Sequence, residues 1–444
     1  MCQRIILRLI IIAIIIFVHA SIVRADLLQY VQKQDESFKW GIEKRIEISP
    51  DVSGFEFEMV SQRWMDIVWK HRVKIVKPDS LMDKSTALLY ITGSGKGDKE
   101  LTYSAAIAHE AGILTAVLHD IPNQPLFEDL REDGLISHTF EQYLEDENEE
   151  WPLLFPMVKS VVRAMDLIQE FSAKEFGLKI ERFILMGASK RGWTTWLTPV
   201  VDFRVKGIIP MVYDNLNINA QMKHQIATWG AYSEQISEYT EKGIQEKIET
   251  GSGKRLAEMV DPYTWRDTLT LPKLIINGTN DRYWTLDALH LYWDGLKGEK
   301  YILYVPNSGH KLKDKKRVLG DVIAFCLNIT GRINFPKLDW KFQEVDGKVI
   351  LNLSSTLKPR AVRVWTAVSR DKDFRDAKWE SSRIHRTKQG YISKWEIPKK
   401  GYLAIFGEAS YRLKQKEFYL STNVHIAAGE KLNSIDKVTG KSYN

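Results

Sequence analysis

Residues 183–193 have the sequence FILMGASKRGW, in which an apolar run, a turn of small residues and a helix start follow one another without a gap. The run Phe183–Met186 predicts a buried strand, and a helical pattern begins at Lys190. A strand that turns sharply into a helix at a serine presents the hydroxyl at the edge of a sheet. The stretch therefore predicts Ser189 as a nucleophile, although a serine before a helix is also an ordinary N-cap.

The turn departs from the usual nucleophile pattern at one position. That pattern has a second glycine two residues after the serine, where this chain has Arg191, and Gly192 comes one residue later. The motif is therefore less specific than its first residues suggest, so neighbouring segments have to support it.

Further short apolar runs on both sides of this turn predict strands that are covered on both faces. The runs span residues 87–92, 113–118, 205–213, 273–277 and 301–305, and helical patterns cover 99–110, 157–176, 190–198, 285–296 and 314–329. This alternation predicts an α/β fold with a largely parallel sheet, preceded by antiparallel strands at 55–60 and 71–76. The longest interruptions, about 121–156 and 214–271, are expected to cap the carboxyl edge of the sheet.

An acid and a histidine follow two later strands of this predicted sheet. Asp281 lies in the loop after the run 273–277, and His310 lies in the loop after the run 301–305. Serine, acid and histidine at the ends of successive strands, in that chain order, are typical of α/β-hydrolases. An imidazole must take the proton of the serine, and a carboxylate must hold the imidazole. The sequence thus predicts Ser189, Asp281 and His310 as a catalytic triad, with Asp214 as the alternative acid.

Two segments are candidates for stabilising an oxyanion. The amide of Lys190 lies at a predicted helix N-terminus, where backbone N–H groups have no helical partner. The loop GSGKG, residues 93–97, follows the strand 87–92 and allows close backbone approach. Ser94 or Gly95 is therefore expected to supply the second donor, although the loop is also compatible with a plain flexible turn.

The chain changes character after residue 335. Alternating segments recur at intervals of about 10–15 residues through 336–430, which predicts a small β-sandwich of the immunoglobulin or fibronectin type. Residues 26–335 are then the hydrolase-like domain, and residues 431–444 form a tail.

The first 25 residues have the pattern of a signal peptide. Arg4 and Arg8 flank the start of a ten-residue apolar run, 9–18, which is too short to cross a bilayer. We expect secretion and no membrane attachment after cleavage. Asn277, Asn328 and Asn352 stand in N-x-Ser/Thr sequons and are glycosylation candidates, although Asn277 ends a predicted buried strand.

The charge composition of the chain limits the classes of partner that it is expected to bind. The formal net charge of +6 arises from 63 basic and 57 acidic residues that are spread along the chain, without a basic cluster of the kind that nucleic-acid binding requires. No ligand pattern for a metal or cofactor accompanies the triad, so we expect none.

Four segments resemble the PhoPQ-activated pathogenicity-related protein family. They are residues 151–160, 187–193, 210–214 and 280–281. The resemblance implies an α/β-hydrolase fold, a following β-sandwich and secretion, and it leaves the substrate open. The turn at Ser189 is also similar to that of glucuronoyl esterases, in which an arginine that helps to hold the oxyanion occupies the position of Lys190.

The sequence supports two hypotheses of function. The first is a secreted serine hydrolase that cleaves a small ester or a peptide by acyl transfer. The alternative is a secreted signalling or adhesion protein that uses the same fold for binding, with the β-sandwich contacting a cell-surface protein.

Overall fold

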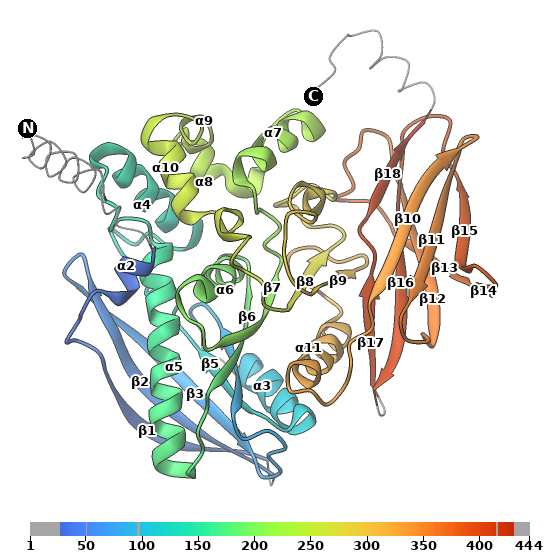
Figure 1. The fold of residues 1–444 in the computed structure, drawn as a ribbon. Coiled ribbons are helices and arrows are strands. Elements are labelled where there is room, and N and C mark those ends of the chain that lie inside the picture. The colour runs from blue at the N-terminus through green and yellow to red at the C-terminus, as the bar shows by residue number, and fades with distance from the viewer. Residues whose placement is uncertain (1–26, 50, 96–97, 414–415, 430–444) are drawn as a thin grey trace, which may run out of the picture.

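The computed structural model describes residues 27–49, 51–95, 98–413 and 416–429 (Figure 1). The predicted signal peptide and C-terminal tail lie outside these residues. A nine-stranded sheet and two smaller antiparallel sheets make up the β-structure of the described chain.

The large sheet has the strand order β1-β2-β3-β5-β4-β6-β7-β8-β9. Strands β1 to β3 are antiparallel, β5 is antiparallel to β3, and the strands from β5 to β9 along this order are parallel. Their bounds are β1 Lys39–Ser49, β2 Val52–Trp64, β3 Ile67–Pro78, β4 Thr86–Ile91, β5 Leu114–Leu118, β6 Arg182–Ala188, β7 Val205–Met211, β8 Lys273–Gly278 and β9 Lys300–Val305. The predicted parallel sheet is confirmed, and β1 was not predicted.

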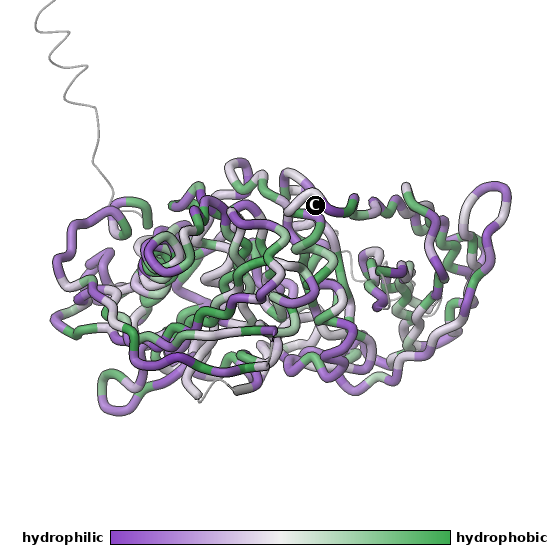
Figure 2. The backbone as a smooth tube through the Cα atoms, turned by 90° about the horizontal axis from the view of Figure 1, so that it is seen from below, coloured by the Kyte–Doolittle hydropathy of each residue, from purple (hydrophilic) through white to green (hydrophobic). Residues whose placement is uncertain are grey.

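Alternate side chains of the central strands enter two separate cores. On β4, Leu89 packs with one core cluster and Leu88 with the other. The first cluster is covered by α5 (Leu154–Phe176) and α6 (Lys190–Val201), and the second by α3 (Asp98–Ala111) and α11 (Lys315–Ile329). Strands covered on both faces explain the continuous apolar runs. Figure 2 shows these apolar segments running through the middle of the body.

The prediction of a helix at 285–296 is wrong. The segment contains only a short 3₁₀ helix, η3 (Ala288–Leu291), and otherwise turns. Leu289, Tyr292 and Leu296 are buried, so their helical spacing reflects burial alone. Gly295 approaches the Tyr263 hydroxyl so closely that an added Cβ would lie 2.1 Å from it. This close approach leaves no room for a side chain at position 295.

Helices inserted after β5 and β7 lie at the carboxyl end of the parallel strands (Figure 1). The first insertion contains α4 (Glu132–Asp146), which packs against α8, α9 and α10 of the second. The helices of the second insertion are α7 Ile218–Trp229, η1 Glu234–Ile236, α8 Ser237–Thr240, α9 Ile244–Lys247, α10 Gly251–Val260 and η2 Pro262–Trp265. We call α4 together with the helices from α7 to η2 the cap.

The C-terminal strands form two antiparallel sheets, consistent with a β-sandwich. The order is β10-β11-β15-β14 in one sheet and β13-β12-β16-β17 in the other, where β18 also pairs with β16. Their bounds are β10 Leu338–Val345, β11 Lys348–Ser355, β12 Ala361–Ser369, β13 Glu380–Ile384, β14 Arg386–Thr387, β15 Gly390–Glu396, β16 Tyr402–Leu413, β17 Lys416–Ser421 and β18 His425–Ala428. β17 contacts α11 and β9, so this part packs directly on the large sheet.

Across the described residues, none of the helices combines the length and apolarity that crossing a bilayer demands.

Candidate active site

Ser189 has a strained backbone at the turn between β6 and α6. Its φ is 58° and its ψ is −126°, in a region that residues with a Cβ seldom occupy. The turn is tight because two glycines allow close approach. A Cβ on Gly187 would lie 2.4 Å from the Arg191 carbonyl oxygen, and a Cβ on Gly192 would lie 2.9 Å from that of Met211. Gly192 thus permits close packing of α6 on β7 although Arg191 occupies the usual glycine position.

Arg191 connects this turn to the cap. Its Nη1 and Nη2 each lie 2.7 Å from a carboxylate oxygen of Glu132, and its Nε donates to the Ile121 carbonyl at 2.5 Å. The guanidinium passes beneath the loop after β4, where a Cβ on Gly93 would lie 2.3 Å from Nη2. Burial alone would raise the Glu132 pKa, but the hydrogen bonds and charge of Arg191 outweigh it and lower that pKa to about 2.

Asp281 and His310 form a hydrogen-bonded pair on the loops after β8 and β9. His310 Nδ1 lies 2.8 Å from Asp281 Oδ2 and 3.1 Å from Oδ1. The Tyr283 amide also donates to Asp281 Oδ1, at 3.0 Å, and fixes the carboxylate. A carboxylate on Nδ1 leaves Nε2 as the nitrogen that exchanges protons with a nucleophile.

Tyr283 contacts His310 and lines the same pocket as Ser189. Its ring stacks on the His310 imidazole, with centroids 4.2 Å apart and planes at 28°, and it also lines the pocket that contains Ser189. His310 Nε2 is buried and has no hydrogen-bond partner among the described residues. The structure therefore joins His310 to Asp281 but shows no hydrogen bond from His310 to Ser189 within the described chain. Catalytic hydrogen bonds are often long or poorly aligned before substrate binds.

The pocket beside Ser189 is small and mainly apolar. It has a volume of about 70 Å³ and lies between the turn and the cap. The indole of Trp193 stacks on the Tyr213 ring, with centroids 5.0 Å apart, and forms one wall. The cap supplies the other apolar side chains, which include Phe140, Ile218, Met222, Ile236, Ile244, Ile248, Leu256 and Val260.

Lys190 was predicted to supply an oxyanion donor, and the structure leaves only its amide for that role. It is the first residue of α6, where the amide has no partner within the helix. Its Nζ lies 2.7 Å from Asp133 and 3.5 Å from Glu132, so the ammonium is occupied by the cap. The arginine role known from the glucuronoyl esterase turn is therefore not reproduced by this side chain.

Comparison with known proteins places the chain in a family. Residues 27–375 match the sequence profile of the PhoPQ-activated pathogenicity-related proteins. The chain belongs to the PhoPQ-activated pathogenicity-related protein family. Autocrine proliferation repressor protein A of Dictyostelium discoideum is 31% identical, over 88% of this chain and 87% of that protein.

One solved structure of an esterase has a similar fold. Acetyl xylan esterase 1 from Thermoanaerobacterium sp. superposes with a TM-score of 0.50 at 13% identity, over 68% of this chain and 91% of that chain. At that identity the similarity shows the fold alone. This member of the PhoPQ-activated pathogenicity-related family therefore has the α/β-hydrolase architecture.

The remaining predicted residues of this family member lie as follows. Ser94 and Gly95 are exposed and are not among the residues that line the Ser189 pocket, so their role as donors stays a prediction. Asp214 is buried, and its Oδ1 accepts a hydrogen bond from the Tyr292 hydroxyl at 2.5 Å. Burial raises the Asp214 pKa to about 7. The acid that contacts His310 is Asp281.

Sequence reasoning missed Tyr283 and the link between Arg191 and Glu132. Tyr283 stands two residues after the predicted acid, and proximity in the chain was the only available signal. Glu132 lies 59 positions before Arg191, so no local pattern connects them.

The three sequons occupy different environments. Asn277 is buried in β8, where a glycan has no room in the folded chain, whereas Asn328 and Asn352 are partly exposed. Their modification stays a prediction.

Proposed function

We propose that this protein is a secreted serine hydrolase that cleaves carboxylic esters or peptides by acyl transfer, with Ser189 as nucleophile. The observation that carries the proposal is the strained backbone of Ser189, because such strain at a strand-to-helix turn persists where it serves a function. The Asp281–His310 pair on the two loops expected for the acid and the base supports it. Secretion rests on the signal-peptide pattern of residues 1–25.

In the proposed reaction, His310 Nε2 takes the proton of the Ser189 hydroxyl as its oxygen attacks the substrate carbonyl. Asp281 holds Nδ1–H and stabilises the imidazolium that forms. The Lys190 amide and a donor from the loop at 93–95 stabilise the oxyanion. His310 then gives this proton to the leaving group as its bond to the carbonyl carbon breaks, which leaves an acyl-enzyme on Ser189. Water attacks the acyl-enzyme with His310 as base, and Ser189 takes the proton back as the acid product leaves.

The pocket favours a short apolar acyl group. Its volume of about 70 Å³ and its apolar walls leave no space for a long chain beside Ser189 in the observed arrangement. The acetyl xylan esterase of the same fold acts, as its name states, on a small acyl group, which is consistent with this choice.

A second function is favoured by one observation, the name of the relative from Dictyostelium discoideum. A repressor of proliferation acts as a signal, and a β-sandwich of the immunoglobulin or fibronectin type would provide a surface for a cell-surface partner. In this alternative, the hydrolase fold serves for binding and catalysis is not essential.

Covalent labelling tests the proposal. A fluorophosphonate probe should label the purified wild-type protein and fail to label Ser189→Ala. Ser94→Ala is a matched control, because it removes another serine hydroxyl near the site but keeps the backbone amide; its labelling should persist. Equal labelling of wild type and Ser189→Ala would reject Ser189 as the nucleophile. A growth assay in which Ser189→Ala keeps full signalling activity would favour the alternative function.

A further inference from the structure

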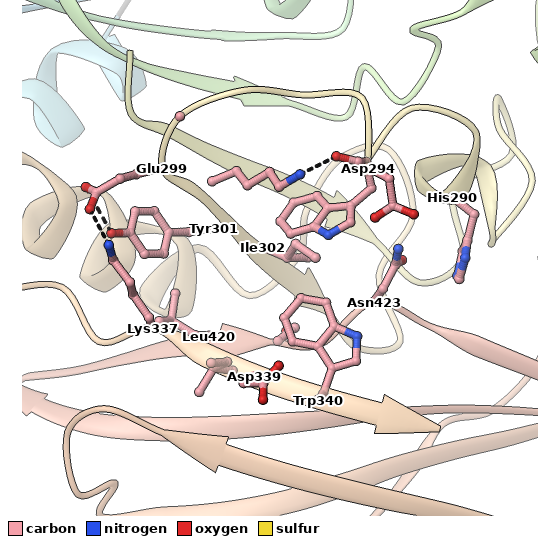
Figure 3. Close-up of a pocket in the computed structure, with 15 residues that line it drawn as sticks. His290, Asp294, Glu299, Tyr301, Ile302, Lys337, Asp339, Trp340, Leu420 and Asn423 are labelled. Carbon is pink, nitrogen blue, oxygen red and sulfur yellow. Dashed lines mark hydrogen bonds and ion pairs between the residues drawn. The ribbon is translucent and has the colours of Figure 1, made fainter. Parts of the chain in front are cut away.

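A cleft separate from the Ser189 pocket lies where the C-terminal sheets meet the large sheet. It has a volume of about 720 Å³ (Figure 3). One wall comes from the segment 290–302, including η3 and the start of β9, and the other from β10 and the segment 420–423. It shares no lining residue with the Ser189 pocket. Clefts of this volume between domains commonly hold ligands.

Two tryptophans, one from each wall, form the aromatic part of this cleft. The rings of Trp293 and Trp340 lie 5.9 Å apart at 41°. Lys300 fixes Trp293, because its ammonium lies 4.6 Å from the ring centroid and donates to the Trp293 carbonyl. Figure 3 shows Trp340 rising from β10 towards Asn423 and Asp294. Trp340 is only partly buried, so its indole offers an apolar surface to a ligand.

The polar groups opposite Trp340 are held in place. Asn423 Oδ1 accepts from the Val424 amide at 3.0 Å and from the Tyr304 hydroxyl at 3.4 Å, which directs the amide nitrogen away from these partners. His290 Nε2 donates to the Val424 carbonyl oxygen at 2.5 Å, so in the neutral imidazole Nδ1 is left as an acceptor for a ligand. Asp294 is exposed and interacts electrostatically with Lys300, but it forms no hydrogen bond with any described residue. The cleft thus presents one fixed donor, the Asn423 amide, beside two acceptors, His290 Nδ1 and the Asp294 carboxylate.

The charges disfavour an anionic ligand. Lys337 pairs with Glu299 at 2.8 Å, and Lys300 is bonded to backbone carbonyls. The other charges are the Lys300 ammonium, which interacts with the Asp294 carboxylate, and the carboxylate of Asp339. Three carboxylates thus face two ammonium groups in the lining. A phosphate or an acidic polymer would meet no uncommitted cation there.

We propose that this cleft binds a neutral carbohydrate. A sugar ring has an apolar face of C–H groups, which suits the Trp340 indole, and its hydroxyls donate and accept, which suits Asp294, Asn423 and His290. The site lies outside the proposed hydrolase centre, and its occupation does not depend on Ser189.

Calorimetric titration of the full-length mature protein tests this site. The probes are neutral oligosaccharides of four units: xylotetraose, mannotetraose, cellotetraose and chitotetraose. We expect at least one to bind with a Kd of roughly 10⁻⁵–10⁻³ M. Trp340→Ala and Asp294→Asn should each weaken that binding by about tenfold or more. Asp294→Asn matters most, because it changes an exposed group that forms no hydrogen bond with any described residue.

Two controls separate a site from a general effect. Phe342→Ala alters an aromatic side chain two positions along the same strand, on the same face as Trp340 but outside the cleft, and should leave binding unchanged. Ser189→Ala should also bind normally, so failure of the proposed hydrolase would not mimic failure of this site. Absence of binding by all four probes at about 10 mM would overturn the proposal. Equal binding by Trp340→Ala, or binding of N-acetyl-lysine amide with no oligosaccharide binding, would overturn it as well.

Discussion

The two terminal nitrogens of Arg191 each lie 2.7 Å from a carboxylate oxygen of Glu132. One partner stands on the helix that follows the serine, and the other is the first residue of the cap helix α4. A paired guanidinium and carboxylate of this geometry fixes both position and angle. Arg191, the residue that departs from the usual glycine pattern, therefore connects the turn at Ser189 to the cap.

Loss of the Glu132 charge should weaken the fold in a pH-dependent way. The folded-state pKa of Glu132 is about 2, below the ordinary value of 4.5, so its stabilising contribution is present above pH 4.5 and is lost as the pH falls towards 2. Thermal unfolding should show Glu132→Gln to be less stable than wild type at pH 6, with a difference that narrows at pH 3. A difference that is constant over this range would contradict the ion pair. Glu396→Gln, in an exposed pair with Lys348, is the control and should have little effect.

Arg191→Lys should lower activity more than it lowers stability. Lysine keeps the charge but has no planar fork, so it cannot bond both Glu132 oxygens and the Ile121 carbonyl together. We expect kcat to fall by roughly tenfold, because the loop at 93–95 loses its support, with a melting temperature within a few degrees of wild type. An unchanged kcat would show that the cap does not need this fork. Arg182→Lys is the matched control, because it makes the same substitution in the ion pair with Asp83, outside the site.

Replacement of the strained serine by glycine should stabilise the protein. Ser189 has φ 58° and ψ −126°, which glycine adopts without the steric cost that a Cβ imposes. We expect Ser189→Gly to exceed Ser189→Ala in the free energy of unfolding by about 1 kcal/mol, with both variants inactive. Chemical denaturation compares the two directly. An alanine variant as stable as the glycine variant would mean that the turn holds no strain.

The acid of the triad can be assigned by comparing two asparagine variants. Asp281 contacts His310, whereas Asp214 contacts Tyr292, so only Asp281→Asn removes the partner of the imidazole. We expect Asp281→Asn to lower kcat by roughly 10²–10⁴, and Asp214→Asn to stay within a few-fold of wild type. The rate of ester hydrolysis in the two variants tests this assignment. A larger loss of kcat in Asp214→Asn than in Asp281→Asn would identify Asp214 as the acid of the triad.

Asp214 also predicts a specific pH dependence of stability. Burial raises its pKa from 3.8 to about 7, so its contribution is fully present below pH 3.8 and is lost as the pH rises through 7. Asp214→Asn removes this titration and should be more stable than wild type at pH 8 by a few kcal/mol, but not at pH 4. Unfolding curves at the two pH values test the sign. A variant less stable than wild type at pH 8 would contradict the raised pKa.

Several features of this protein follow from local patterns in its sequence. The short apolar runs predicted the parallel sheet. The chain order of Ser189, Asp281 and His310, with the glycines beside Ser189, predicted that these residues follow strands at one edge of it. Such features are local because a buried strand needs apolar residues on both faces, and a tight turn needs glycine.

Other features were decided only by the tertiary structure. The apolar spacing at 285–296 predicted a helix, but the segment forms a short 3₁₀ helix and turns, and Gly295 packs closely against Tyr263. The pairing of Arg191 with Glu132, the stacking of Tyr283 on His310 and the cleft between Trp293 and Trp340 join segments from different parts of the fold. Sequence periodicity reports whether a side chain is buried, whereas the partner it meets depends on how the sheets, the cap and the C-terminal strands pack together.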